Sequence, residues 1–258
     1  MKPILFTIGS YNVYAFGLFL ALGFLLSTFI VWFFGREDLK EEEYLDAYIA
    51  TCVVSLIGAR LGYIATHIQE FGDTILRFIL VRETPGLSLL SGICVGIVYL
   101  FFYCRGKKLS FVRLGDIYAV AISLALGLVK LGQLLGGAGM GAITQAPFAV
   151  RIVGLAGKRH PVELYEAIGY FILFVALIVL LKQTIRRKWM PGSITMVFMI
   201  GAGIIIFTLE FLKEYTIYLY GLSLRQFIVS GFTLITLVIL MIRLRVIPKL
   251  VVYFKKKP

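Results

Sequence analysis

The stretch YNVYAFGLFLALGFLLSTFIVWFF, residues 11–34, gives the clearest indication of the fold class. It contains no charged residue, and a helix needs only about 20 apolar residues to cross the ~30 Å hydrocarbon core of a bilayer. The stretch is too long for the core of a signal peptide, and no small-residue cleavage site follows it, so we expect it to be retained. It therefore predicts a first transmembrane helix near the N-terminus.

Six more apolar stretches of similar length follow, and charged or turn-rich segments separate them. They cover residues 45–66, 86–103, 114–135, 162–181, 192–212 and 222–242. Composition agrees with this pattern, because 60% of the 258 residues are hydrophobic and 16% are charged, whereas soluble domains average about 45–50% apolar and ~25% charged residues. We therefore predict an all-α integral membrane protein with seven transmembrane helices, folded as a single domain over residues 1–258.

Lysine and arginine are distributed unequally between the segments that join the predicted spans. The two sets of alternate segments hold 16 and 7 of these residues, and loops rich in Lys and Arg normally face the cytoplasm. The count predicts that the N-terminus lies outside and that the C-terminus is cytoplasmic. The net charge of +12 then lies beside anionic headgroups, and no nucleic-acid partner is expected.

Cysteine and histidine give no sign of a metal or redox site. Cys52, Cys94 and Cys104 lie within or at the end of predicted spans, and their spacing matches no metal-binding or redox pattern. The two histidines, His67 and His160, are not at metal-ligand spacing either. We therefore expect neither a metal nor a cofactor.

The informative residues are the polar ones inside the predicted spans, because an ionisable group near a bilayer centre costs about 2.5–3.5 kcal/mol on insertion scales. In the predicted orientation all but one of them fall in the outer half of their helices. The exception, Asp116, lies at an inner end beside Arg113 and is interpreted as a solvated headgroup contact. The others predict a cavity that opens toward the outer lipid layer, and they are Arg60, Lys130, Gln133, Glu163, Glu166, Glu210, Arg225 and Gln226.

Six glycines surround Lys130 in the stretch GLVKLGQLLGGAGMG, residues 127–141. Glycine allows a backbone to approach another backbone or a ligand closely. One interpretation is simple helix packing followed by a loop. The other is a pocket wall, including Gly132 and Gly141, that exposes Lys130 and backbone N–H groups to an anion. A cation, a close backbone and an outer position together suit a phospholipid headgroup.

Seven short motifs, in matching order, resemble those of the bacterial prolipoprotein diacylglyceryl transferases. The element RHPVELYE is fairly specific, whereas the other motifs are individually weak and gain their force from their order. They are FTIGSYNVYAFGLFLALGF at 6–24, ARLGY at 59–63, GLSLLSG at 86–92, KLGQLLGGAGMG at 130–141, RHPVELYE at 159–166, LEFLK at 209–213 and SLRQ at 223–226.

The resemblance implies a specific reaction at the outer leaflet of the bacterial inner membrane. Such enzymes move the diacylglyceryl group of phosphatidylglycerol to the lipobox cysteine of a prolipoprotein, which makes a thioether and releases glycerol phosphate. The implied partners are this lipid, the lipobox segment and the bilayer. Lys130 would bind the phosphate, and Glu210 or His160 would accept the thiol proton. The implied substrate-binding residues are Arg60, Gly132, Gln133, Gly141, Tyr165, Arg225 and Gln226.

Several positions depart from the family's pattern. The motif histidine falls at Leu90, the signature arginine is Lys130, and the sixth-helix arginine falls at Ile206. Lysine keeps the charge but lacks the planar fork that grips a phosphate through two bonds. The signature asparagines and glutamate are also replaced, at Gln133, Gly136 and Ala138.

These departures leave a second hypothesis open, which is a relative that binds glycerolipid or lipoprotein without transferring anything. A solute transporter is disfavoured, because its site should lie near the midplane of a repeated architecture. Alternatives also stand for single residues. His160 could tie a loop to the following helix, Arg60 could brace helix packing by pairing with Glu166 or Glu210, and Glu163 with Glu166 could serve the N-terminus of a helix.

Overall fold

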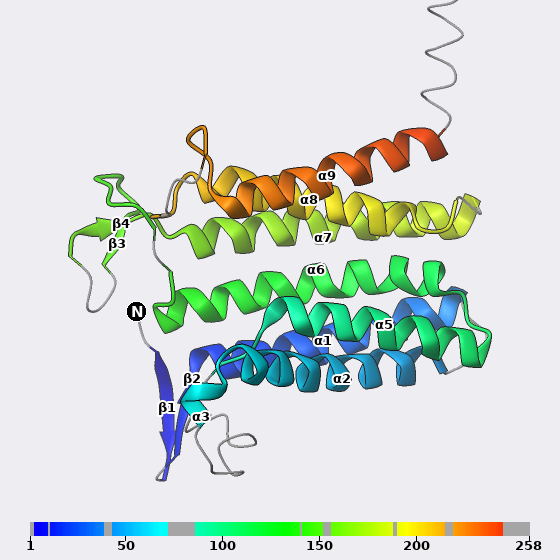
Figure 1. The fold of residues 1–258 in the computed structure, drawn as a ribbon, viewed down its shortest axis with the longest axis horizontal. Coiled ribbons are helices and arrows are strands. Elements are labelled where there is room, and N and C mark those ends of the chain that lie inside the picture. Colours follow the sequence, from blue (N-terminus) through cyan, green and yellow to red (C-terminus); the bar gives the residue numbers. More distant parts are fainter. Residues whose placement is uncertain are drawn as a thin grey trace, which may run out of the picture. The chain divides into compact units, whose positions relative to one another are not determined.

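The computed structural model describes residues 3–9, 11–38, 43–71, 86–139, 141–151, 156–187, 190–214 and 219–244. Within these ranges seven helices are long and apolar enough to cross a membrane, which confirms the predicted fold class. These seven helices, shown in Figure 1, are α1 (Ala15–Asp38), α2 (Glu43–Thr66), α5 (Leu89–Lys107), α6 (Phe111–Gly136), α7 (Val162–Arg187), α8 (Ser193–Glu210) and α9 (Leu224–Arg243), and a short helix, α3 (Ile68–Phe71), follows α2.

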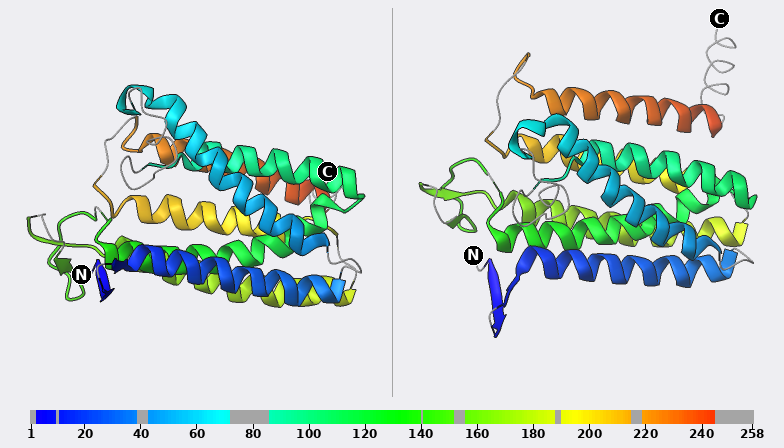
Figure 2. Two further views of the ribbon diagram at one scale, coloured as in Figure 1. Left: turned by 90° about the horizontal axis from the view of Figure 1, so that it is seen from below. Right: turned by 60° about the horizontal axis from the view of Figure 1, so that its bottom comes forward.

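The first span starts later than predicted. Residues 11–14 were expected to be helical, but they form strand β2 (Tyr11–Tyr14), which pairs antiparallel with β1 (Ile4–Ile8). Their aromatic and β-branched side chains favour a strand, and Gly9, with φ of 60°, takes the left-handed backbone conformation next to the turn. The hairpin adjoins the N-terminal end of α1 in both views of Figure 2.

Contacts along the chain group it into two compact units. The first contains Met1–Ile30 and Gly115–Pro258, and the second contains Val31–Leu114. The first unit therefore includes the N-terminal part of α1, most of α6, and α7, α8 and α9. The second includes α2, α3 and α5. The expectation of a single domain over the whole chain stays a prediction.

In the second unit, α2 packs along α5. Glycines make this approach possible, because a Cβ on Gly58 would overlap Val95 and a Cβ on Gly62 would overlap Ser91. Arg60 lies between these glycines, is buried, and donates from its guanidinium to the carbonyl oxygen of Gly86 at 3.1 Å.

In the first unit, α7 packs on α8, and α8 packs on α9. The N-terminal part of α1 lies against α6, where Gly132 leaves space for Phe19, and α6 lies against α7, where Gly127 leaves space for Phe171. Many apolar side chains on these helices are open to the surroundings, among them Leu25 at 61% and Ile172 at 66% exposure. Such outward apolar surface is suited to lipid.

The prediction that Asp116 makes a solvated headgroup contact is wrong, because this residue is buried. Its side chain is 4% exposed and reaches from α6 to the N-terminal end of α8. One carboxylate oxygen accepts from the backbone N–H of Gly192 at 2.6 Å, and the other accepts from the N–H and the hydroxyl of Thr195 at 2.8 and 3.0 Å. These N–H groups lack partners within the helix, and the helix dipole favours a negative charge beside them.

We predict that Asp116→Ala lowers the stability of the folded protein by about 1–3 kcal/mol, because it leaves buried helix N–H groups without an acceptor. Thermal unfolding in detergent would measure this loss. Asp46→Ala, which removes an exposed aspartate from the first turn of α2, is the control and should change stability far less. Equal losses in the two variants would contradict the capping role.

Candidate functional site

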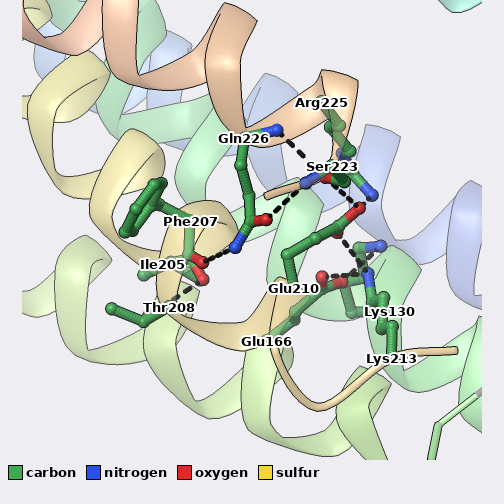
Figure 3. Close-up of polar contacts among 10 residues, drawn as sticks. All are labelled: Lys130, Glu166, Ile205, Phe207, Thr208, Glu210, Lys213, Ser223, Arg225 and Gln226. Atoms are coloured by element: carbon green, nitrogen blue, oxygen red, sulfur yellow. Dashed lines mark hydrogen bonds and ion pairs between the residues drawn. The ribbon is translucent and has the colours of Figure 1, made fainter. Parts of the chain in front are cut away.

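Charged side chains from four helices and one loop meet at one end of the first unit (Figure 3). Lys130 lies near the C-terminal end of α6, Glu166 near the N-terminal end of α7, and Glu210 is the last residue of α8. Lys213 follows in the loop after α8, and Arg225 lies in the first turn of α9. Because successive helices run in opposite directions, these alternate C- and N-terminal ends lie at the same end of the helix bundle.

Glu166 is the centre of this cluster. Its side chain is 1% exposed, and each carboxylate oxygen carries one lysine. The ammonium of Lys130 lies 2.5 Å from Oε2, and that of Lys213 lies 2.6 Å from Oε1. A buried carboxylate requires such compensation, because desolvation of an unpaired ion costs several kcal/mol.

Glu210 is held more loosely at the neighbouring position. Its Oε2 lies 3.3 Å from Nη1 of Arg225 and 3.9 Å from Nζ of Lys213, and its Oε1 accepts from the hydroxyl of Ser223 at 3.5 Å. Lys130 and Glu210 thus belong to one chain of alternating charges. The order of the ion-paired residues in this series is Lys130, Glu166, Lys213, Glu210 and Arg225.

Lys213 is a member of the cluster that was not among the predicted site residues. The backbone explains its position, because Gly141 forms a β-bridge with Lys213 and the N–H of Ala142 donates to the carbonyl of Leu212 at 2.8 Å. The loop after α6 thereby fixes the loop after α8. One feature of the sequence could have identified Lys213. It lies three residues after Glu210, a spacing that brings its ammonium group within reach of the glutamate.

Gln226 supports the start of α9. Its Oε1 accepts from the N–H of Ser223 at 2.8 Å, while the Ser223 hydroxyl accepts from the N–H of Gln226 at 3.1 Å. This reciprocal capping box satisfies two helix N-terminal donors, and the Gln226 amide also donates to the carbonyl of Phe207 at 3.2 Å. Both ends of the amide are therefore engaged within the protein, and its role toward a headgroup stays a prediction.

The two glycines predicted to bind substrate have close backbone neighbours. A Cβ on Gly132 would lie 2.8 Å from Cβ of Phe19 on α1, and a Cβ on Gly141 would overlap the carbonyl oxygen of His160. The carbonyl of Gly141 also accepts from the guanidinium of Arg159 at 3.0 Å. These contacts favour the packing interpretation of the glycine-rich stretch.

His160 and Tyr165 form a small aromatic group with Phe148. The ring of Tyr165 lies edge-on to both, with centroids 6.1 Å from Phe148 and 6.3 Å from His160. Nδ1 of His160 and the hydroxyl of Tyr165 are buried, and neither has a hydrogen-bond partner in the described part of the chain. Two polar atoms of this kind are available to a ligand.

Two further predicted residues, Gln133 and Arg60, belong to different units of the chain. Gln133 is on α6, one turn beyond Lys130 and on the same side of the helix. Arg60 belongs to the second unit, where it donates to Gly86. The suggested partners of Arg60 have ion pairs of their own within the first unit, Glu166 with two lysines and Glu210 with Arg225.

The charge balance of the cluster suits an anion. Lys130, Lys213 and Arg225 carry three positive charges against the two negative charges of Glu166 and Glu210, which leaves one net positive charge. A phosphodiester carries one negative charge. Among the described residues, no group of three or more His, Cys, Asp and Glu is placed to hold a metal ion.

The fold and the cluster define a multi-span helical membrane protein with buried charges at one end of its bundle. The family model for prolipoprotein diacylglyceryl transferase matches residues 3–243. The chain belongs to this family, and the resemblance predicted from the motifs is confirmed.

Three relatives carry the name phosphatidylglycerol–prolipoprotein diacylglyceryl transferase. The Finegoldia magna protein is 29% identical over 244 residues, which cover 94% of this chain and 96% of the relative. The Geobacter sulfurreducens protein is 30% identical over 219 residues, or 83% of each chain. The Idiomarina loihiensis protein is 28% identical over 255 residues, with 94% and 93% covered.

We predict that Gly141→Ala destabilises the protein by about 1–3 kcal/mol, because the added methyl group meets the backbone of His160 and pushes apart two parts of the connection between α6 and α7. Gly136→Ala is the matched control, since a Cβ there meets nothing within 4 Å. Thermal unfolding of both variants in detergent tests the difference. A Gly141 variant as stable as the Gly136 variant would show that this connection yields easily.

Proposed function

We propose that this chain transfers the diacylglyceryl group of phosphatidylglycerol to the lipobox cysteine of a prolipoprotein. In this reaction the cysteine sulfur forms a bond to the glyceryl carbon, and the bond between that carbon and the phosphate oxygen breaks. The thiol proton passes to a base, and glycerol phosphate leaves. The family membership supports this activity, and the observation that carries it to particular residues is the buried cluster around Glu166 with its net positive charge.

The leaving phosphate needs a cation, because negative charge grows on the bridging oxygen as the bond breaks. Lys130 is our candidate for this role. Its side chain is 17% exposed, so it can meet a ligand while it remains paired with Glu166. Arg225, which is 48% exposed at the other end of the cluster, is our candidate for attracting the anionic headgroup. Gln133 and Tyr165 are further candidates for contacts with the headgroup.

Glu210 is our candidate for the base that accepts the thiol proton. A base must lie within hydrogen-bonding reach of the thiol when the thiol faces the reacting carbon. Glu210 belongs to the same chain of charges as Lys130, and its contacts of 3.3–3.9 Å are looser than those of Glu166. His160, with its unpartnered Nδ1 among the described residues, is the alternative base.

A second candidate function is a lipid-binding relative without transfer activity. The replaced motif positions favour it, since Leu90 and Ile206 can neither accept a proton nor hold a phosphate. Leu90 is in addition 74% exposed. This hypothesis keeps the lipid-binding role of the charge cluster and removes the chemistry.

Reconstitution with phosphatidylglycerol and a lipobox peptide separates the two functions. We expect the intact chain to release glycerol phosphate, and we expect Lys130→Ala to lower the rate by about 100-fold or more, because a charge that stabilises the transition state is lost. Lys107→Ala, which removes a lysine paired with Glu43 on the second unit, should leave the rate unchanged. Binding of phosphatidylglycerol without any release would instead support the second function.

We further propose that the cluster faces the outer leaflet of the bacterial inner membrane, with the N-terminus outside and the C-terminus cytoplasmic. In a chain without its native cysteines (Cys52, Cys94 and Cys104), Asn12→Cys should react with a membrane-impermeant maleimide on intact cells. Arg105→Cys should react only after the membrane is opened. The reverse pattern would overturn the orientation.

A further inference from the structure

Glu166 holds an unusual position for a carboxylate. It lies one turn inside α7, its side chain is 1% exposed, and both of its oxygens are engaged by lysines that come from other segments. A group buried this deeply cannot be explained as a solvated partner of the helix N-terminus. The cost of burying it is offset only because two ammonium groups converge on it.

The two lysines remain incompletely engaged. Each ammonium group has three N–H donors. Within the described part of the chain, Glu166 is the one ion-pair partner of Lys130, and Lys213 adds only the 3.9 Å approach to Glu210. Their side chains are 17% and 14% exposed. Glu166 therefore fixes both ammonium groups and leaves them with donors for a further acceptor.

A single lysine is a poor device for orienting a phosphate, because its charge is a point at the end of a flexible stem of four carbons. Two ammonium groups that are ion-paired with the two oxygens of one carboxylate are held in more definite positions than a single flexible lysine. They are held side by side, so they can offer two donors to two oxygens of one phosphate. Without the carboxylate they would repel each other in a medium of low dielectric constant.

We propose that Glu166 is a positioning residue, which holds Lys130 and Lys213 together so that both ammonium groups contact the phosphate of the bound lipid. This inference rests on the proposed function for the identity of the lipid. Glu166 itself does not touch the substrate. It acts through the lysines, and its effect on lipid binding should vanish when Lys130 is absent.

The first test compares Glu166→Gln with Glu43→Gln, which removes the carboxylate paired with Lys107 on the second unit. The probe is dioctanoyl phosphatidylglycerol, titrated into the full-length protein in neutral detergent. We expect Glu166→Gln to raise the Kd and the KM for this lipid by about 10- to 100-fold, because small misplacements of binding groups have effects of this size. Glu43→Gln should change them less than about threefold.

A double-mutant cycle then separates positioning from general structural damage. In a Lys130→Ala background, Glu166→Gln should raise the Kd less than about threefold further, because the group through which it acts is already gone. Losses that multiply independently in the double variant would overturn the proposal. An unchanged or lower Kd in the single Glu166→Gln variant would also overturn it, since the carboxylate would then compete with the phosphate for the lysines.

Glu166→Gln removes the counter-ion of Lys130 and leaves Lys213 only its 3.9 Å approach to Glu210, so this variant could fail to fold. The charge-balanced variant Glu166→Gln with Lys213→Gln, compared with Lys213→Gln alone, covers this case. We expect the double variant to bind the lipid about tenfold more weakly than the single one, because Lys130 loses its anchor, and equal Kd values would overturn the proposal. If the intact chain binds the lipid with an affinity that depends on Glu166 but transfers nothing, the proposed function alone would be refuted.

Discussion

The ion pairs of Glu166 with Lys130 and Lys213 are the contacts around which one end of the first unit is organised. A carboxylate that is 1% exposed is stable only with cations on it. Those cations come from α6 and from the loop after α8, while the carboxylate comes from α7. The electrostatic requirement of one buried group thus ties three segments that are distant in sequence.

Backbone contacts make that arrangement possible. Gly141 lies against the carbonyl of His160 and bridges to Lys213, so the loops after α6 and α8 join the segment before α7. At the next helix, the capping box of Ser223 and Gln226 fixes the start of α9, which carries Arg225. The charged side chains therefore project from loops and helix ends that the backbone has already placed, which is how a precise site is usually supported.

The cluster gathers charge although two motif positions of the family are occupied by apolar residues in this chain. Ile206 and Leu90 are apolar, yet the first unit still gathers three cations and two carboxylates at one end. Two lysines on one carboxylate present neighbouring point charges, whereas an arginine presents a planar fork. The difference lies in how the charge is held, because each lysine depends on its counter-ion for a fixed position.

The sequence by itself determined that the chain spans a membrane and which family it belongs to. Seven apolar stretches of this length are suited to the interior of a lipid bilayer. The ordered motifs were specific enough to predict the family, which the family model confirms. The sequence also identified Lys130, Glu210 and Arg225 as polar residues that lipid would exclude. It misjudged the segment at 11–14, where local β-propensity and the turn at Gly9 form a hairpin. It likewise misjudged Asp116, whose partner is a helix end 76 residues away in sequence.

Only the tertiary structure decided which charges pair. Glu166 could have capped its own helix, and Lys213 looked like one more loop cation. The choice depends on which charged side chains the packing of helix ends and loops brings within ion-pair distance, and for Glu166 these are the ammonium groups of Lys130 at 2.5 Å and Lys213 at 2.6 Å. Hydropathy and residue spacing describe each helix by itself. An ion pair between two helices depends on how the helices pack, so these patterns do not determine it.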